Sequence, residues 1–456
     1  MVITHGRVFE EVRTKREELS AGRGFEDHLP IELIQRILDE LAIEWRQCVY
    51  CPTVTLWTFL TQILSADHSC QNAVDKLLVF LLTSGSKPCS SDTGPYCKAR
   101  SRLTEPFISR LAQEVGERLH ANGPKAGFLG GRPVKLIDGC TVSMPDTSAN
   151  QEIYPQPKTQ KKGLGFPIAR LLAVISFHSG AVLDLAIGPY KGKGTGENAL
   201  LRSVWDQFSP GDVVVADRAF GSYCNIALSK ESGIDLVTRL HQKRHYDFRT
   251  GKRLGKDDHI VTWSKPQERP DWLDKETFEQ LPDELEVREV KIRVRVKGFR
   301  VQQYVLVTTL LDASKEELAA IFRVRWNVEL DIRAIKSVMQ MDILRCKTPS
   351  MVRKEIWVHL LGYNLIRSVM ADAAQQHEIS PREISFKGAL QTVNAFLDVL
   401  HLVDPKDTDA FYQIMLDAIA HHRVGNRPNR SEPRAVKRRP KPMPLLNKPR
   451  ARARQC

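Results

Sequence analysis

The order of strand-like and helical segments between Val134 and Arg239 is the feature that most restricts the fold. Apolar and β-branched residues form short runs, and segments with helical periodicity separate the later ones. A turn at 178–180 joins two of the runs into a hairpin. In chain order the expected elements are strand 134–138, hairpin strands 168–177 and 181–187, helix 197–208, strand 213–217, helix 222–232 and strand 234–239. This order predicts an α/β fold built on a mixed sheet of five strands.

The first and the fourth of these strands each end in an aspartate, Asp138 and Asp217. A carboxylate at the tip of a buried strand contributes little to solubility and is well placed for a site. A third acid, Glu329, lies inside a strongly helical stretch. Two strand-end carboxylates that face a carboxylate on a helix can hold two divalent cations and drive in-line displacement at a phosphodiester. We therefore expect these three acids to be the catalytic residues and the ligands of two Mg²⁺ ions, with Mn²⁺ as a substitute.

The helix around Glu329 carries an unusual stripe of side chains. Ser314 and Glu317 form a capping box that predicts where the helix begins, and the periodicity continues to about residue 341. At 100° per residue, one face collects the residues Phe322, Arg325, Glu329, Arg333 and Lys336. A face packed in the core would be apolar, and a solvated face would offer more acids to pair with three bases. The stripe therefore favours an active site whose cations bind the phosphates of a nucleic acid.

A long insertion, 240–312, separates the second acid from the third and is expected to be rich in β-strands. In its last run, 289–298, cations alternate with apolar residues. The cations on the exposed face are Lys291, Arg293, Arg295 and Lys297. A plain half-exposed strand explains the alternation, but it does not explain why four successive exposed positions are all basic. We predict that these four residues bind DNA beside the acidic site.

The stripe around Glu329 also resembles a known signature. Phe322, Arg325, Glu329 and Lys336 have the spacing of the tyrosine–arginine–glutamate–lysine signature of bacterial DDE transposases of the insertion-sequence-four type. Phenylalanine stands at the tyrosine position, so the hydroxyl that would contact a phosphate is absent. Segments 137–139 and 216–218 resemble the surroundings of the other two acids, and the strand order is that of a ribonuclease-H-like fold. Trp326 resembles a tryptophan that such enzymes use near a distorted DNA end.

The resemblance implies a DNA transposase of the cut-and-paste type. In such an enzyme, cleavage at the element end frees a 3′-hydroxyl, which forms a hairpin with the opposite strand; the hairpin is reopened by water before attack on the target. The implied partners are double-stranded DNA, at terminal inverted repeats and at the target, and a second copy of the chain in a homodimer. Phe322, Arg325, Trp326, Arg333 and Lys336 are the expected DNA-binding residues on the helix.

Three other interpretations use part of the same pattern. A structure-selective nuclease of the same fold, such as a junction resolvase, would use the same acids but would need neither the insertion nor Lys336. A catalytically defective copy would bind DNA ends and inhibit transposition; the intact acids argue against it, although Phe322 keeps this alternative open. A transcription regulator would leave the strand-end carboxylates unexplained.

The segment boundaries follow from these patterns. We expect an N-terminal helical, DNA-end-binding domain at 1–128, the catalytic core at 129–239 and 313–375, the insertion at 240–312, a C-terminal helical region at 376–422 and a basic tail at 423–456. The net charge of +13 is concentrated in this tail, where twelve Lys and Arg residues stand against one acid between 423 and 454. Six prolines in the same stretch predict a disordered arm that adds salt-sensitive affinity for DNA.

The composition also restricts the cellular setting. Every long apolar run is interrupted by charged residues, so we expect no membrane span. The N-terminus lacks the apolar segment of a secretion signal, and nine cysteines then predict reduced thiols in a bacterial cytoplasm, close to the nucleoid. Cys48 and Cys51 have the spacing of half a zinc site, but no second pair follows at ligand spacing, so helix packing is the favoured role.

Overall fold

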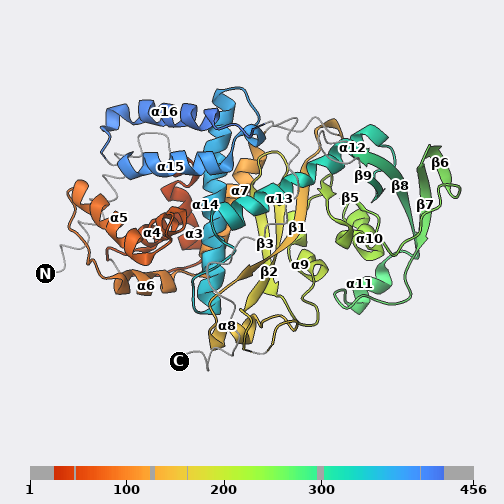
Figure 1. Ribbon diagram of the computed structural model, residues 1–456, viewed down its shortest axis with the longest axis horizontal. Coiled ribbons are helices and arrows are strands. Elements are labelled where there is room, and N and C mark those ends of the chain that lie inside the picture. The colour runs from red at the N-terminus through yellow and green to blue at the C-terminus, as the bar shows by residue number, and fades with distance from the viewer. Residues whose placement is uncertain are drawn as a thin grey trace.

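The computed structural model describes residues 25–45, 48–123, 129–161, 163–294, 302–400 and 402–425. One sheet runs through the molecule, and Figure 1 shows helices from both ends of the chain gathered at one side of it, with the strands of the insertion at the opposite end. The strand order across the sheet is β3-β2-β1-β4-β5-β9-β8-β7-β6. The basic tail beyond residue 425 lies outside the described residues.

The described residues form nine strands, which are β1 (Val134–Ser143), β2 (Ile168–Ser176), β3 (Val182–Pro189), β4 (Val213–Val215), β5 (Asp235–Arg239), β6 (Lys252–Gly255), β7 (Asp258–Ser264), β8 (Glu284–Val294) and β9 (Gln302–Thr308). The five strands expected from the sequence form one half of the sheet. Strands β1, β4 and β5 are parallel, and β2 pairs antiparallel with both β1 and β3. The predicted hairpin and the predicted mixed sheet are confirmed.

The prediction that the sheet ends after five strands was wrong. Strand β9 pairs antiparallel with β5, with Val237 opposite Thr308, so the β-rich insertion extends the same sheet instead of forming a separate one. The physical reason is that β5 would otherwise present a free edge, and its backbone groups find partners in a strand that follows far along the chain. A local sequence pattern carries no information about that pairing.

The helices outnumber the strands and lie mostly in the first and last parts of the chain. Their bounds are α2 (Phe25–His28), α3 (Ile31–Glu40), α4 (Pro52–Leu64), α5 (Cys70–Thr83), α6 (Thr93–Arg102), α7 (Glu105–Ala121), α8 (Ser148–Ile153), α9 (Glu197–Ser203), α10 (Tyr223–Glu231), α11 (Lys275–Gln280), α12 (Lys315–Val324), α13 (Trp326–Arg333), α14 (Pro349–Gln376), α15 (Phe386–Leu400) and α16 (Thr408–His421). In the described part of the chain, no helix has the length and apolar character needed to cross a bilayer.

The two faces of the sheet are buried by different helices. Leu136 and Val215 belong to the core that includes residues of α7 and α14, whereas their neighbours Ile137 and Val214 belong to the core under α9 and α10. Because side chains alternate along a strand, β1 and β4 can be apolar at successive positions only when both faces are covered. This arrangement explains the apolar run that precedes Asp217 and the apolar pair Leu136 and Ile137 that precedes Asp138.

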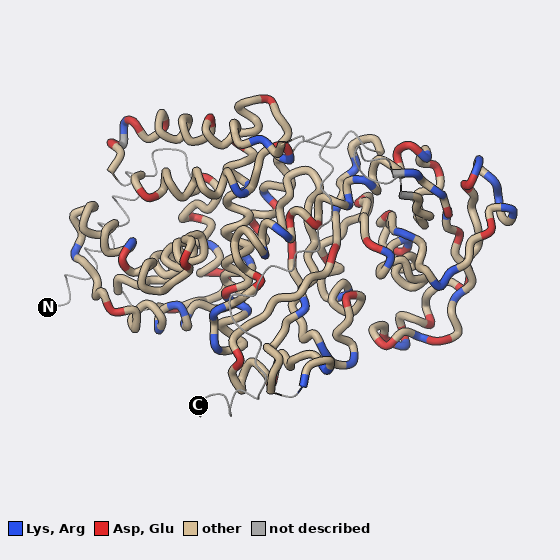
Figure 2. The backbone as a smooth tube through the Cα atoms, viewed as in Figure 1, with Lys and Arg blue, Asp and Glu red and all other residues tan. Residues whose placement is uncertain are grey.

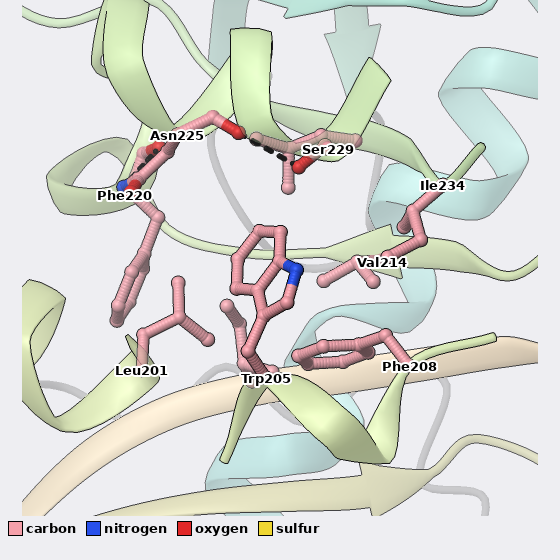
Figure 3. Close-up of a pocket in the computed structure, with 10 residues that line it drawn as sticks. Leu201, Trp205, Phe208, Val214, Phe220, Asn225, Ser229 and Ile234 are labelled. Carbon is pink, nitrogen blue, oxygen red and sulfur yellow. Dashed lines mark hydrogen bonds between the residues drawn. The ribbon is translucent and has the colours of Figure 1, made fainter. Parts of the chain in front are cut away.

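Trp205, which follows α9, is half-buried and packs against the core under α9 and α10. Its indole N–H donates to the Ser232 hydroxyl at 3.1 Å, and the ring borders a small apolar cavity (Figure 3). The other side chains that line this space are Ile137, Leu201, Phe208, Val214, Phe220, Asn225, Ser229, Ile234 and Leu236. Ile137 precedes Asp138 and Phe220 follows Asp217 in a short 3-10 helix, so this packing fixes the backbone near both acids.

Helix α7 approaches β3 closely at Gly116. A Cβ atom at this position would collide with the carbonyl oxygen of Val182 and lie 2.9 Å from the side-chain nitrogen of Asn364. Asn364, on α14, donates to the carbonyl oxygens of Ala112 at 2.9 Å and Val182 at 2.8 Å, so its amide ties α7, β3 and α14 together. Only glycine leaves room for this contact.

Gly116→Ala is therefore expected to lower the free energy of unfolding by about 1–3 kcal/mol, the usual cost of overfilling a packed core. Alanine favours a helix by about 1 kcal/mol over glycine, so a result in the opposite direction would show that the contact is loose. The measurement is urea denaturation of both proteins. Gly362→Ala is the matched control, because the nearest atoms that its Cβ would meet are the side-chain ends of Leu64, Met339 and Leu60, at 3.3, 3.5 and 3.7 Å, and a smaller loss is expected.

Candidate active site

Asp138 and Asp217 lie where β1 and β4 separate. The two strands are parallel and pair as far as Leu136 and Val215; β4 then ends, while β1 continues along β2 to Ser143. Asp138 is thus inside a strand that is longer than expected and not at its tip, because the hairpin strand β2 continues to supply backbone partners. Both acids nevertheless lie just beyond the last paired residues of β1 and β4, as expected for a site at the ends of parallel strands.

The backbone around each aspartate is held by hydrogen bonds. A carboxylate oxygen of Asp138 accepts from the N–H of Gly139 at 2.8 Å. The carbonyl oxygen of Asp217 accepts from the Thr238 hydroxyl at 2.8 Å and from the N–H of Phe220 at 3.0 Å. These contacts fix the carboxylate of Asp138 on β1 and the backbone of Asp217 directly after β4.

Glu329 lies on α13, and the helical run that leads to it begins as predicted. The Ser314 hydroxyl accepts from the Glu317 N–H at 3.2 Å, and the Glu317 carboxylate accepts from the Ser314 N–H at 2.9 Å, which confirms the capping box. The expectation of one α-helix to about residue 341 was wrong in detail. Arg325 separates α12 from α13, a π-helical turn occupies Ala334–Val338, and the run ends there. Such π-turns are frequent at functional sites because they reorient neighbouring side chains.

Arg325 connects Glu329 electrostatically to the first aspartate. Its guanidinium donates to the Glu329 carboxylate at 2.8 Å, and its side chain is only 14% exposed. The pKa of the Asp138 carboxyl is raised to about 6, chiefly by burial, with further increases from the carboxylates of Glu197 and Asp217; the Gly139 N–H and Arg325 oppose the increase. Asp217 and Glu197 therefore act on the charge state of Asp138, and Arg325, which pairs with Glu329, acts on it as well.

The donor set fits a hard divalent cation in its chemistry, because carboxylate oxygens are the ligands that Mg²⁺ prefers. Burial is the main cause of the raised pKa of Asp138, and the charges of Glu197 and Asp217 add to it. In the described conformation, however, no three His, Cys, Asp or Glu side chains among the described residues lie close enough to hold one metal ion. A cation bound by both Asp138 and Glu329 would compete with Arg325 for the Glu329 carboxylate.

The other residues of the predicted stripe lie in different environments. Phe322 is buried, and its ring packs on that of Tyr304 with 5.7 Å between centroids, so it contributes to the core. Trp326 is 61% exposed and Arg333 is also exposed. Lys336 is half-buried and lies near Cys140 on β1. Burial raises the pKa of the Cys140 thiol to about 11, and the positive charge of Lys336 opposes that increase.

The alternation predicted along the last run of the insertion is present in the described part of β8. Arg293 is exposed and Lys291 half-buried, whereas Ile292 between them is buried; Arg295 and Lys297 lie outside the described residues. The face that carries Lys291 also includes the buried Glu289, which accepts from the Trp263 indole at 2.9 Å. Figure 2 shows Lys and Arg mixed with Asp and Glu over strands β6–β8.

Residues 129–365, just over half of the chain, match the model of the transposase DDE domain family. The chain belongs to the DDE transposase family. The matched part of this transposase contains Asp138, Asp217 and Glu329, and the prediction of a transposase from the sequence is confirmed.

The transposase is similar along almost its whole length to a bacterial relative. It is 25% identical over 433 residues to the transposase InsG for insertion sequence element IS4 of Escherichia coli (strain K12), covering 92% of this chain and 93% of the relative. It is 31% identical over 80 residues to the putative transposase InsL for insertion sequence element IS186A of the same strain, covering 17% and 22%. A cryo-EM structure of the piggyBac transposase synaptic complex with hairpin DNA aligns with a TM-score of 0.44 and 9% identity over 86% of this chain and 81% of that one.

Glu197 is the residue near the site that the sequence patterns did not indicate. It begins α9 and acts on the pKa of Asp138 more strongly than Asp217 does. An acid at the start of a helix is common, because it stabilises the helix end, so its sequence context gave no reason to select it.

Proposed function

We propose that this transposase moves an insertion sequence by cutting it from DNA and joining it to a new target. Asp138, Asp217 and Glu329 would be the catalytic acids of a ribonuclease-H-like core formed by β1 to β5. The observation that carries the proposal is that all three acids lie inside the part of the chain that matches the DDE family, where Arg325 pairs with Glu329 and, like Asp217, also acts on Asp138.

The three acids would hold two divalent cations, Mg²⁺ or Mn²⁺. When bound, such ions lower the pKa of an attacking water and neutralise charge on the leaving oxygen of a phosphodiester. The chain itself would supply the groups that hold the DNA. Arg325 and Lys336 are placed beside Glu329 and β1, where a guanidinium and an ammonium would bind the phosphates around the cleaved bond.

The exposed residues of α13 would contact DNA farther from the cleaved bond. The Trp326 ring is free to stack on a base displaced at the element end, and Arg333 lies on the exposed surface of the same helix. Lys291, Arg293, Arg295 and Lys297 would bind the duplex next to the site. Phe322 would support the side chain of Arg325, because the guanidinium carbon of Arg325 lies 5.9 Å from the centroid of the Phe322 ring.

The remaining parts of the proposal concern specificity and assembly. The phenylalanine–arginine–glutamate–lysine series would place the enzyme in the subgroup that has tyrosine at the first position. The N-terminal helices would recognise the terminal inverted repeats, and the basic segment 423–456 would add sequence-independent affinity. Two ends must be joined in one event, so we propose a homodimer on the DNA, acting in a bacterial cytoplasm.

The test is cleavage of a labelled duplex that carries the element end, with Mg²⁺, with Ca²⁺ and with EDTA. Nicking at one defined position with Mg²⁺ only, and transfer of the freed 3′-hydroxyl to a second duplex, are the expected results. Cutting restricted to branched DNA would instead support a structure-selective nuclease. Binding of the duplex without any cleavage would support a defective, inhibitory copy.

A further inference from the structure

Two cysteine side chains in the N-terminal helices lie in contact with each other. Cys70 is the first residue of α5, Cys97 lies in α6, and their sulfur atoms are 3.9 Å apart. Figure 1 shows the two helices at the end of the molecule that carries the N-terminus. Both residues are half-buried, and none of the eight described cysteines forms a disulfide. A disulfide requires about 2 Å between its sulfurs, so a movement of about 2 Å would be enough to form one.

Contacts that do not involve the sulfur atoms hold the pair together. The Ser69 hydroxyl caps the start of α5 directly before Cys70. Tyr96, which precedes Cys97, is fully buried, and its hydroxyl donates to the side-chain oxygen of Gln62 at 2.8 Å. The two cysteines therefore lie on elements whose positions are set by the fold, and they meet without a bond between them.

Arg100, on the same helix as Cys97, gives Cys70 the surroundings of a reactive thiol. Burial raises the pKa of the Cys70 thiol; the Arg100 guanidinium opposes this increase, and Cys97 adds to it. The Nε atom of Arg100 is buried and has no hydrogen-bond partner among the described residues. A guanidinium beside a thiol at a helix start stabilises the thiolate, which is the form that attacks a disulfide. Cys70 is therefore the attacking group, and Cys97 completes the bond.

A third thiol, Cys346, lies close enough to Cys70 for their charges to interact. It is only 7% exposed, and burial, together with the Glu355 carboxylate, raises the pKa of its thiol. Cys346 is thus kept protonated and away from solvent, whereas a small oxidant can reach the half-buried pair.

Cys70 also follows the loop through which the N-terminal helices hold the segment after α13 and its π-helical turn. The carbonyl oxygen of Ala66 accepts from the side chain of Gln340 at 3.1 Å, and that of Asp67 accepts from Arg345. Cation binding requires the acids to come closer together than they are in the described conformation. A bond at Cys70 would stiffen the loop, restrict the segment that it holds and so oppose this movement.

The geometry points to Cys70 and Cys97 as a redox-sensitive pair that a small disulfide oxidises to a bond between α5 and α6, with slower strand cleavage as the result. The Cys70 thiolate attacks one sulfur of the oxidant, whose sulfur–sulfur bond breaks and releases one thiolate. Cys97 then loses its proton and attacks the Cys70 sulfur, and the second half of the oxidant leaves. The two cysteines lose two electrons and two protons, and the oxidant becomes two thiols.

The bond is tested by adding oxidised glutathione to the full chain, blocking the remaining thiols with N-ethylmaleimide and identifying peptides by mass spectrometry. A linked pair of peptides that contains Cys70 and Cys97, and that disappears with dithiothreitol, is the expected result. Cys97→Ser should abolish this link. Cys89→Ser is the matched control, because Cys89 is another half-buried cysteine of the same region, and the link should persist. A link from Cys70 to Cys346, or no link at all, would overturn the inference.

The effect on cleavage rests on the proposed function, whereas formation of the bond does not. Cleavage of the element-end duplex should fall several-fold after oxidation and return to the initial rate with dithiothreitol. Cys97→Ser should cleave at one rate in both conditions. An unchanged rate in the oxidised wild-type protein would overturn the regulatory role. Absence of cleavage by the reduced protein would overturn the proposed function alone, because the linked peptides are detected without DNA.

Discussion

Glu329→Gln is expected to reduce strand cleavage by about 10²–10³-fold or more while DNA binding persists, a loss comparable to that on removing one strong electrostatic group from an active site. Glutamine keeps the size of the side chain but removes its charge, and with it the preferred oxygen donor for a hard cation. The 2.8 Å ion pair with Arg325 is lost at the same time. The side chain is 39% exposed, so the folded state should be little affected.

The measurement is single-turnover cleavage of an end-labelled duplex in Mg²⁺, with binding followed by gel shift in Ca²⁺. Glu316→Gln is a matched control, because this acid lies in the exposed first turn of α12 on the same helical run. It should cleave at the wild-type rate. Cleavage by Glu329→Gln within a few-fold of the wild-type rate would show that Glu329 is not a catalytic residue. The catalytic set would then contain Asp138 and Asp217 but no carboxylate from the helix.

The parts of the site that the sequence predicted are those with a local signal. Asp138 and Asp217 each follow an apolar run, and the period-two and period-3.6 patterns around them are visible over a few residues. Glu329 was selected because it is the single acid on a stripe of bases. These signals depend on neighbours in the chain, so they can be recognised without knowledge of the fold.

The parts that the sequence missed depend on contacts between distant segments. The pairing of β5 with β9 is set by sheet geometry, and the contact of Glu197 with Gly139 joins a helix start to a strand far from it in the sequence. The position of Phe322 in the stripe suggested a DNA contact, yet the packing of its ring on Tyr304 is decided by β9. Helical periodicity gives the face on which a residue lies, but it does not say what covers that face.

Asp331, two residues beyond Glu329, shows how such distant contacts support the site. It is fully buried and joins α13 to α14 and to the segment after it. Its carboxylate accepts from Arg367 at 2.5 Å, from Arg382 at 2.7 Å and from the Tyr363 hydroxyl at 3.1 Å. Arg382 also donates to the carbonyl oxygens of residues 176 and 177, at the end of β2. One carboxylate thus anchors the helix that carries Glu329 to α14 and, through Arg382, to the central sheet.

Asp331→Ala is expected to lower the free energy of unfolding by about 3–5 kcal/mol, since it leaves two buried guanidinium groups without their negative partner. Urea denaturation of the two proteins measures the difference. Asp398→Ala is the control, because it breaks the ion pair with Lys76, whose partners are 36% and 55% exposed, and such surface pairs contribute little. An equal midpoint for the two variants would mean that water reaches Arg367 and Arg382 when Asp331 is removed. Because Glu329 lies on the same helix, Asp331→Ala should also slow cleavage under conditions where the variant is folded. Asp331→Glu restores the charge but should not recover the full rate, because the longer side chain does not fit the same three donors.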